Sequence, residues 1–220
     1  FDEAKIIIES IIDKLILYAK SLISNQYILK ELINNIRNYS EEINKILLGI
    51  NITNELTPRT LDLIMSYGEK LALQLVFAFL KQKDFSVALV DAENLIVTNN
   101  RFNYASPLFE DTSINCKELL FPLFHNFQIV ITQGFVGRSK TTQQTTTLGL
   151  ESSNLSAALL AAICNTDELI FWTDVEGFRS CDPKFVVNTK LIPSISYHDA
   201  KLLALNGFKL IFPQMIDIAI

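Results

Sequence analysis

Apolar residues recur every three to four positions over the first fifty residues, which is the spacing of one face of a helix. The polar stretch 24–26 separates two such stripes, so two helices are predicted, and Gly49 is expected to cap the second. The stripes consist of Ile7, Ile8, Ile11, Ile12, Leu15 and Leu17, and of Ile28, Leu29, Leu32, Ile33 and Ile36.

A third, longer helix is predicted to begin at Thr57-Pro58, because threonine is a good N-cap and proline is tolerated in a first turn. Its sequence runs "RTLDLIMSYGEKLALQLVFAFLKQK". Gly68 lies inside this helix at a cost of about 1 kcal/mol relative to alanine. Such a glycine is expected where another backbone or a ligand comes close. Glu69 follows it, as either a solvated helix charge or part of a pocket wall.

From Phe85 onward the pattern changes to short apolar runs that alternate with helical stretches. This alternation predicts a mainly parallel sheet covered by helices on both faces. Ligands of such sheets bind beyond the carboxyl ends of the strands, here at Asp91, 132–137 and 173–174. Ser196 is expected to cap the helix that follows it, with Asp199 three residues on. Strands are predicted at 85–91, 127–137, 168–174 and 208–212, an extended piece at 94–98, a helix broken at Pro122, and further helices at 154–163 and 197–206.

Composition narrows the class of protein. The chain has 220 residues, 49% of them hydrophobic and 20% charged, with a net charge of -5 and no run of lysine and arginine. These values favour a globular domain and argue against a nucleic-acid partner. Apolar stretches such as Leu71–Leu80 are too short to span a bilayer. The three cysteines have no zinc-ligand spacing, so no metal site and a cytoplasmic location are expected.

The segment "TTTLGLESSNLSAALLAA", residues 145–162, combines hydroxyls and a glycine with the start of an apolar helix. We expect a loop here that presents hydroxyl and backbone N–H groups to an anion at the helix N-terminus. Glu151 lies in the middle of this loop, where a carboxylate would repel a phosphate group. The pattern is therefore that of a phosphate site with one feature against it.

Five segments occur in a fixed order: "SYGE", "ITQGFVG", "TTTLG", "FWTDVEGFRSCDPK" and "NGFKLIFPQ". In that order they resemble the catalytic domain of aspartate kinases, in the amino acid kinase family. That family has a Gly-Glu on its long helix, a "QGFIG" turn, "TTTLGRGGSDxSAALLA", "WTDVDGxYTxDPR" and "FGAKVLHP". The resemblance runs from about Leu22 to Pro213, and "WTDVEG" followed by Asp182-Pro183 is its most specific part.

The resemblance implies a three-layer α/β sandwich of the amino acid kinase type, incomplete at both ends. It implies one domain over residues 1–220, with the helical segment 1–50 packed on a core, 51–220, that binds substrate and nucleotide. The implied reaction transfers a phosphoryl group from ATP, with Mg²⁺, to the side-chain carboxylate of L-aspartate. We expect no membrane partner for this chain, and we expect it to form a weak homodimer.

Residue roles follow from the same resemblance. Glu69 would hold the α-ammonium group of aspartate, and Asn154 and Lys209 occupy catalytic positions. Substrate binding is further assigned to Thr145, Thr146, Thr147, Gly149 and Ser153. Nucleotide binding is assigned to Thr173, Asp174, Arg179, Asp182, Lys184 and Lys209. Lys184 replaces an arginine and so keeps the charge without the bidentate fork, and Arg179 replaces an aromatic residue.

The departures from the family pattern lie mainly in one loop, where "GRGGSD" reads "GLESSN". Leu150 replaces an arginine that would grip a substrate carboxylate, Glu151 and Ser152 replace glycines, and Asn154 replaces an aspartate. The family's opening "KFGGTS" strand and its regulatory ACT domains have no counterpart in these residues. We therefore expect weak or no catalysis by this chain. The alternatives are a degenerate module that binds nucleotide or a partner, and a purely structural remnant.

Overall fold

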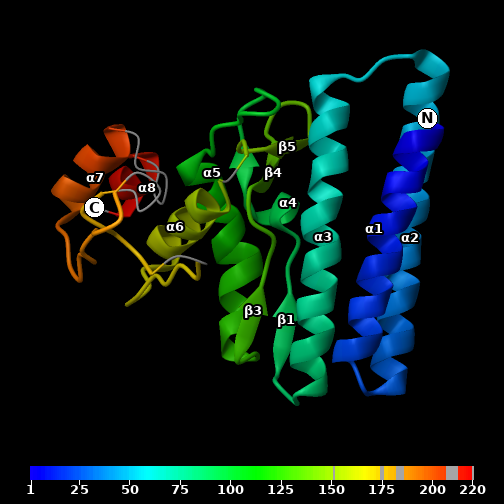
Figure 1. The fold of residues 1–220 in the computed structure, drawn as a ribbon, viewed down its shortest axis with the longest axis horizontal. Helices are drawn as coiled ribbons and strands as arrows, with labels where there is room; N and C mark the ends of the chain where they lie inside the picture. Colours follow the sequence, from blue (N-terminus) through cyan, green and yellow to red (C-terminus); the bar gives the residue numbers. More distant parts are fainter. Residues whose placement is uncertain (151, 174–175, 182–185, 207–212, 220) are drawn as a thin grey trace. The chain divides into compact units, whose positions relative to one another are not determined.

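The computed structural model describes residues 1–150, 152–173, 176–181, 186–206 and 213–219. It contains two units, residues 1–150 and 151–220 (Figure 1). The expectation of one domain over 1–220 stays a prediction. Outside the described residues lie the predicted strand 208–212 and the site residues Glu151, Asp174, Asp182, Lys184 and Lys209.

Three long helices open the first unit: α1 (Asp2–Leu22), α2 (Gln26–Thr53) and α3 (Pro58–Gln82), with α2 packed against both others (Figure 1). Their existence is confirmed, but the predicted cap at Gly49 is wrong. The helix continues to Thr53, and Asn54 takes the left-handed conformation with φ of 56°. Asparagine tolerates this conformation well. The helix therefore ends at Thr53, four residues after Gly49, with Asn54 as its cap.

The core of this helical layer forms where the predicted stripes meet. Thr57 caps α3 as expected, since its side chain accepts a hydrogen bond from the backbone N–H of Thr60, and Pro58 lies in the first turn. The buried core residues are Ile12, Ala19, Ile23, Ile28, Leu32, Ile36, Ile43, Tyr67, Leu71 and Ala78.

Helix α3 joins this helical layer to the strands. Among the described helices it alone is long and apolar enough, by composition, to cross a membrane. It packs on α2 and also against two strands, β1 (Val87–Leu89) and β5 (Thr145–Thr147). Asp62 and Ser66 on it are fully buried. These contacts are typical of a helix at the centre of a folded core, so we interpret α3 as a core helix.

The strands are shorter than predicted and form two small sheets. Strand β1 (Val87–Leu89) pairs in parallel with β3 (Ile129–Ile131). In the second sheet β4 (Val136–Ser139) pairs in parallel with β2 (Val97–Thr98) and antiparallel with β5 (Thr145–Thr147). The parallel pairings agree with the predicted fold class, whereas the predicted single strand over 127–137 divides into β3 and β4 at the turn that contains Gly134.

Two other predictions in this region need correction. The extended piece expected at 94–98 is confirmed only in part: Val97 and Thr98 form β2, whereas 94–95 are the end of helix α4 (Ala92–Leu95). The side chain of Asp91 caps this helix, because it accepts a hydrogen bond from the N–H of Glu93. The threonines expected in a loop at 145–147 form strand β5 and are buried. A hairpin partner is available to them in β4, and β-branched threonines suit such a strand.

Short helices cover the side of the strands away from α3. They are α5 (Phe109–Asn115), the π-helical turn η1 (Cys116–Leu120) and the 3₁₀ turn η2 (Phe121–His125), with η2 against β3 and α5 against β2 (Figure 1). The predicted break at Pro122 corresponds to the start of η2. The first unit is thus layered as helix, strand, helix.

Close packing within the second sheet requires one glycine. A Cβ atom at Gly137 would lie 2.8 Å from the carbonyl oxygen of Ile96, which is shorter than van der Waals contact allows. The N–H of Arg138 donates to the same carbonyl at 2.8 Å. Gly137 therefore lets β4 approach the chain before β2 closely enough for that pairing.

The second unit consists of helices α6 (Ser153–Cys164), α7 (Tyr197–Leu205) and α8 (Pro213–Ala219) with irregular connections. Ser196 caps α7 as predicted, because its hydroxyl oxygen accepts from the N–H of Asp199. The predicted strand 168–174 is wrong for its described residues: 168–173 are irregular, and Trp172 is 94% exposed. A strand needs a hydrogen-bonded neighbour, and the described part of this unit has only the isolated bridge between Arg179 and Leu191.

A buried carboxylate on α3 fixes the end of β5. Asp62 is fully buried, and its carboxylate accepts hydrogen bonds from the N–H of Thr147 at 3.1 Å, the Thr147 hydroxyl at 2.6 Å and the N–H of Asn103 at 2.9 Å. Asn103 has a positive φ of 69°. One side chain therefore supplies acceptors for two segments far from it in sequence.

Replacing Asp62 by alanine is expected to destabilise the protein by about 2–6 kcal/mol, because the buried N–H of Thr147 and the partly buried N–H of Asn103 lose their acceptor at about 1–3 kcal/mol each. Asp62→Asn keeps one acceptor oxygen and should lose less. Urea unfolding measures the difference. The control Asp13→Ala removes an exposed aspartate of α1 and should stay within about 0.5 kcal/mol of the parent. Equal stabilities of Asp62→Ala and Asp13→Ala would contradict this role.

Candidate functional site

The carboxyl ends of β1 and β3 lie beside each other, as the predicted sheet requires. Leu89 pairs with Ile131 in parallel register, so Asp91 and the turn after Ile131 follow adjacent strand ends. In that turn Gln133 is buried, and its side-chain oxygen accepts from the N–H of Ala92 at 2.6 Å. This bond fixes the start of α4 against the turn.

Glu69 of α3 faces this turn. It is half-buried, and its carboxylate accepts a hydrogen bond from the backbone N–H of Gly134. Burial raises the pKa of Glu69 above its usual value, and the Gly134 bond opposes part of that rise. No cationic side chain among the described residues pairs with Glu69. Glu69 is therefore not a fully solvated helix charge, and its role in a pocket wall stays a prediction.

Gly68, next to Glu69, is exposed. A Cβ atom built there would meet no atom within 4 Å. The expected close approach of another protein backbone is therefore absent from the described structure. Space for a ligand remains on this side of α3.

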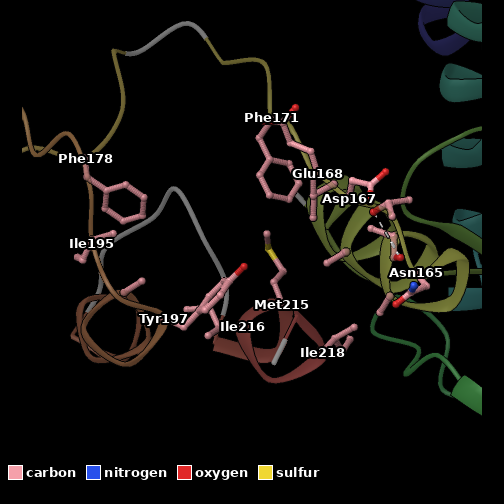
Figure 2. Close-up of a pocket in the computed structure, with 16 residues that line it drawn as sticks. Asn165, Asp167, Glu168, Phe171, Phe178, Ile195, Tyr197, Met215, Ile216 and Ile218 are labelled. Carbon is pink, nitrogen blue, oxygen red and sulfur yellow. Dashed lines mark hydrogen bonds between the residues drawn. The ribbon is translucent and has the colours of Figure 1, made fainter.

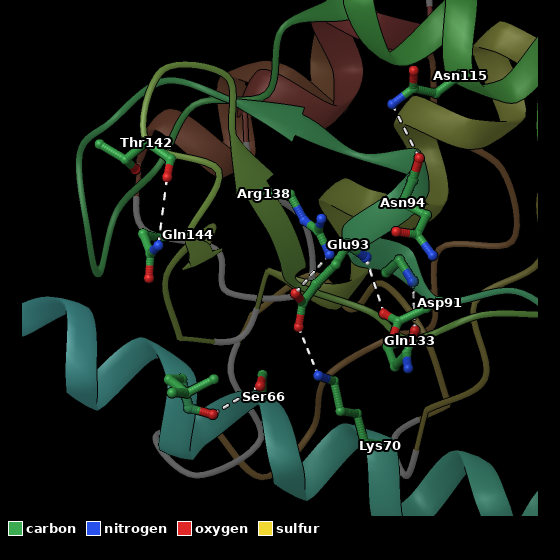
Figure 3. A network of polar contacts seen from close by, with 12 residues as sticks. Ser66, Lys70, Asp91, Glu93, Asn94, Asn115, Gln133, Arg138, Thr142 and Gln144 are labelled. Atoms are coloured by element: carbon green, nitrogen blue, oxygen red, sulfur yellow. Dashed lines mark hydrogen bonds and ion pairs between the residues drawn. The ribbon is translucent and has the colours of Figure 1, made fainter. Parts of the chain in front are cut away.

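A second carboxylate near the strand ends is fully paired (Figure 3). Glu93 of α4 accepts from Lys70 of α3 at 2.7 Å and from Arg138 of β4 at 3.3 Å, and its side chain is only 9% exposed. The Lys70 ammonium also lies 5.3 Å from the centre of the Tyr67 ring. These pairs neutralise Glu93 and tie α3, α4 and β4 together, so Glu93 differs electrostatically from Glu69.

One polar group at the strand ends has no partner in the described structure. The hydroxyl oxygen of Thr132, the first residue after β3, is buried and makes no hydrogen bond. Buried polar groups are nearly always satisfied by protein, water or ligand. A ligand at the strand ends could therefore use this hydroxyl, which sequence reasoning placed only within the range 132–137.

The three threonines assigned to substrate binding have different surroundings. The Thr146 hydroxyl is 2.7 Å from that of Thr98, and the Thr147 hydroxyl donates to Asp62. The hydroxyl of Thr145 has no hydrogen-bond partner among the described residues. In the structure as it stands, two of these hydroxyls serve the fold.

Gly149 follows β5 with a φ of 102°, which side chains rarely adopt. A Cβ atom there would also lie 3.0 Å from the Tyr104 ring. Both observations favour glycine at this position. Leu150, which departs from the family pattern, is 70% exposed.

The second unit carries the remaining described site residues. Ser153 and Asn154 begin helix α6, and Thr173 is exposed in an irregular segment. Arg179 donates to the carbonyl oxygen and hydroxyl of Thr189 at 3.1 and 3.0 Å and pairs with Glu176. Its guanidinium group is thus already engaged, which limits its use as a phosphate contact.

A cavity of about 560 Å³ opens between the helices of the second unit (Figure 2). Phe171, Phe178, Met215 and Ile216 make its wall apolar, and its described lining residues include no lysine or arginine. A polyphosphate needs cationic or N–H partners. The cavity therefore does not suit the phosphate end of a nucleotide.

No group of three or more histidine, cysteine, aspartate or glutamate residues in the described part of the chain could hold a metal ion. Magnesium commonly binds through one or two carboxylates together with substrate phosphates. A site with fewer protein ligands would not contain such a group.

Sequence reasoning missed several residues that shape this region: Asp62, Lys70, Glu93 and Arg138. A signal for the first was available, since Asp62, Ser66 and Glu69 follow the i, i+4, i+7 spacing of one face of a mostly apolar helix. The ion pairs had no such signal, because Glu93 lies 23 positions from Lys70 and 45 from Arg138.

The chain resembles known proteins in both sequence and structure. The family model described as "Amino acid kinase family" matches residues 15–220. Lysine-sensitive aspartokinase 3 of Escherichia coli (strain K12) is 33% identical over 181 residues, which are 80% of this chain and 40% of that protein. Aspartokinase 1 of Bacillus subtilis (strain 168) is 32% identical over 166 residues, 74% of this chain and 39% of that protein. The chain thus spans about two fifths of the length of these relatives.

Among solved structures, E. coli aspartokinase III in complex with aspartate and ADP (R-state) matches with a TM-score of 0.74 and 27% identity, over 94% of this chain and 50% of that one. The complex of the same enzyme with lysine and aspartate (T-state) matches with a TM-score of 0.68. These neighbours confirm the expected α/β fold class. On the family match over residues 15–220 and the aspartokinases that resemble it, the chain belongs to the amino acid kinase family.

Proposed function

We propose that this chain is an aspartate kinase-type domain that binds L-aspartate and ATP with Mg²⁺, and that its own phosphoryl transfer is weak or absent. In the reaction of this type, a side-chain carboxylate oxygen of aspartate takes the γ-phosphoryl group of ATP, giving 4-phospho-L-aspartate and ADP. The observation that carries the proposal is Glu69, a half-buried carboxylate at the strand ends without a cationic partner in the described structure.

Glu69 is suited to the α-ammonium group of an amino acid. A partly buried carboxylate attracts a cation more strongly than a solvated one, because the local dielectric is lower. Lys70, its neighbour in sequence, is committed to Glu93. The open space at Gly68 and the unpartnered Thr132 hydroxyl leave room and a donor near the same strand ends. The E. coli structure with aspartate and ADP supports this choice of ligand.

The nucleotide side of the proposal depends on residues that the resemblance assigns. Thr173 and Arg179 are described, whereas Asp174, Asp182, Lys184 and Lys209 lie outside the described residues. Mg²⁺ would bind through the phosphates of the nucleotide, as it commonly does with one or two carboxylates. We also propose a cytoplasmic location for this protein.

Weak catalysis is proposed because of the loop 150–154. Phosphoryl transfer depends on positioning and charge neutralisation, with little covalent help from the protein. Leu150 offers no charge to a substrate carboxylate, and Asn154 lacks the charge of the family's aspartate. Glu151 adds a negative charge close to where phosphates would bind. The exposed Leu150 side chain forms no substitute contact that could replace an arginine.

The alternative is a degenerate module of the same fold that binds nucleotide or a partner without turnover. The engagement of Arg179 by Thr189 and Glu176 favours it, because that arginine then contributes to structure. Calorimetric titration with ATP and magnesium, and separately with L-aspartate, separates the cases. Binding of nucleotide without binding of aspartate supports the module, and binding of aspartate that is lost in Glu69→Gln supports the kinase-type domain.

Glu69→Gln tests the ammonium-binding role through both affinity and pH dependence. The substitution should weaken aspartate binding about 10- to 100-fold, the usual worth of a hydrogen bond to a charged group at 1.5–3 kcal/mol. It should also raise stability at neutral pH. The folded pKa of Glu69 exceeds that of the unfolded chain, about 4.3, so the folded state binds more protons and loses stability as pH rises through this window.

The stability advantage of Glu69→Gln over the parent should therefore disappear as pH falls below the unfolded value. Urea unfolding at several pH values and titration calorimetry with aspartate measure the two effects. Glu41→Gln, which changes an exposed glutamate of α2, is the control and should alter neither. Unchanged aspartate affinity in Glu69→Gln would remove the main support for the proposal.

Catalysis gives the second test. Purified protein should release almost no ADP in an aspartate-dependent manner, because each lost electrostatic contact costs about 3–4 kcal/mol, or about 100- to 1000-fold in rate. Restoring the loop with Leu150→Arg, Glu151→Gly, Ser152→Gly and Asn154→Asp, with a "KFGGTS" strand fused before Phe1, should raise the rate. If the restored protein shows no higher rate than the parent, the assignment of the loop is refuted. A fully active parent would refute the proposed weak catalysis.

We also propose a weak homodimer through helix α1. Its outer face carries exposed apolar residues at helical spacing, and its two halves differ in charge, so two antiparallel copies would place opposite charges together. The exposed apolar residues are Ile7, Ile11, Tyr18 and Leu22. The first half, 2–12, holds Asp2, Glu3 and Glu9 against Lys5, and the second half, 13–22, holds Lys14 and Lys20 against Asp13.

Sedimentation equilibrium should show concentration-dependent dimerisation of the parent. Ile11→Lys should shift the protein to monomer, because a charge would be buried in the interface. Ile52→Lys, at an exposed isoleucine of α2, should leave association unchanged. A parent that is monomeric at every concentration would contradict the dimer.

A further inference from the structure

A separate cavity of about 250 Å³ lies in the first unit beside the start of α3. Its lining comes from three elements: Ile46 of α2, then Arg59, Thr60 and Leu63 of α3, and finally Gln144 and Thr145 at the start of β5. One of these side chains is cationic and none is a carboxylate. The electrostatic character of the cavity is therefore positive, in contrast to the wall formed by Glu69.

Thr145 is the residue that marks this cavity as a binding site. It is 9% exposed, and its hydroxyl has no hydrogen-bond partner among the described residues, whereas the hydroxyls of Thr146 and Thr147 on the same strand are both bonded. Side chains alternate along a strand, so Thr145 shares with Thr147 the face toward α3. The Thr145 hydroxyl oxygen is not among the buried unpartnered atoms of the described residues, so water or a ligand in the cavity can reach it.

Arg59 supplies the charge. It is exposed in the first turn of α3, and no described carboxylate pairs with it. The N-terminal end of a helix carries a partial positive charge, which adds to that of the guanidinium group. Arginine also presents a planar fork of donors that matches a carboxylate or a phosphate group. Gln144 adds a side-chain amide at the cavity wall.

We propose that this cavity binds the oxyanion group, carboxylate or phosphate, of a small anionic ligand, with Arg59 as its charge partner and the Thr145 hydroxyl as a donor. The cavity is slightly below the usual range of small-molecule sites, roughly 300–1,000 Å³, so the ligand is small. The site shares Thr145 with the substrate residues that the family resemblance implies, but Arg59 lies outside that set, and neither Glu69 nor the loop 150–154 is involved.

Occupation of this site would act on strand β5. Thr145 at one end of the strand would contact the anion, while Thr147 at the other end is bonded to Asp62. A ligand that orders the start of β5 thus supports the same strand that the family resemblance assigns to substrate binding. The two ends are connected by three residues of backbone.

The test is amide ¹⁵N spectroscopy of the protein titrated with inorganic phosphate or, separately, with acetate, against sodium chloride at matched ionic strength. We expect saturable shifts of the Thr145 and Gln144 amide signals. Tighter binding of phosphate indicates a phosphorylated ligand, and tighter binding of acetate a carboxylate ligand. Shifts no larger than those produced by sodium chloride overturn the proposal.

Variants locate the site. Arg59→Gln should weaken the anion about tenfold or more, in line with 1.5–3 kcal/mol for a charged hydrogen bond, and Thr145→Val should weaken it while Thr145→Ser retains it. Arg37→Gln removes an exposed arginine of α2 as the matched control and should have no effect. Equal losses in Arg37→Gln and Arg59→Gln would show non-specific attraction and refute the site.

Glu69→Gln separates this site from the proposed substrate site. Its phosphate affinity should equal that of the parent even though its aspartate affinity falls. Loss of the anion in Glu69→Gln would show that one site had been taken for two. Failure of aspartate binding in the parent, with the Arg59-dependent phosphate shifts intact, would reject the kinase proposal and leave the anion site in place.

Discussion

The carboxylate of Asp62 is the constraint on which the site region depends. A fully buried carboxylate without hydrogen bonds would be very unfavourable, because it loses its hydration. Three donors, two from Thr147 and one from Asn103, replace the water that it loses. The exchange satisfies both sides, since the two backbone N–H groups would themselves be buried without an acceptor. The end of β5 and the turn at Asn103 are therefore fixed to α3 at one point.

Two helical turns along the same face, α3 presents Glu69 to the turn at Gly134. The two carboxylates have different environments and so different uses. Asp62 is saturated by donors from the fold, while Glu69 receives one backbone N–H and keeps capacity for a cation. The nearby Lys70 and Arg138 do not interfere, because Glu93 occupies both. A carboxylate mounted on a long, packed helix has little freedom to move, which suits the proposed role of Glu69 in orienting an amino acid.

The sequence was most informative where local chemistry decides the structure. Thr57 and Ser196 were predictable as caps because their side chains bond to N–H groups only a few residues away. The predicted cap at Gly49 was wrong, because Asn54 can also end the helix and the apolar face of the helix continues as far as Asn54. Glu69 was found through its family resemblance, but its lack of a cationic partner required the structure.

The predictions failed where the structure of a segment depends on a pairing partner that is distant in the sequence. Residues 145–147 became a strand because β4 lies beside them, and 168–173 did not, because the described residues offer them no neighbouring strand. The ion pairs of Glu93 and the bonds of Asp62 join positions far apart in the chain, and no periodicity reveals such contacts. The anion cavity at Arg59 likewise combines three elements that are distant in sequence.

The central claim is that α3 holds the site region in place before any ligand binds. Amide hydrogen exchange of the ligand-free protein tests this most directly, at the N–H groups of Thr147, Asn103 and Gly134. If the carboxylates of Asp62 and Glu69 hold these groups, the Thr147 and Asn103 amides should exchange as slowly as those of β1 and β3, and the Gly134 amide more slowly than exposed turn amides. Exchange of all three at the rate of an unstructured loop would contradict the account.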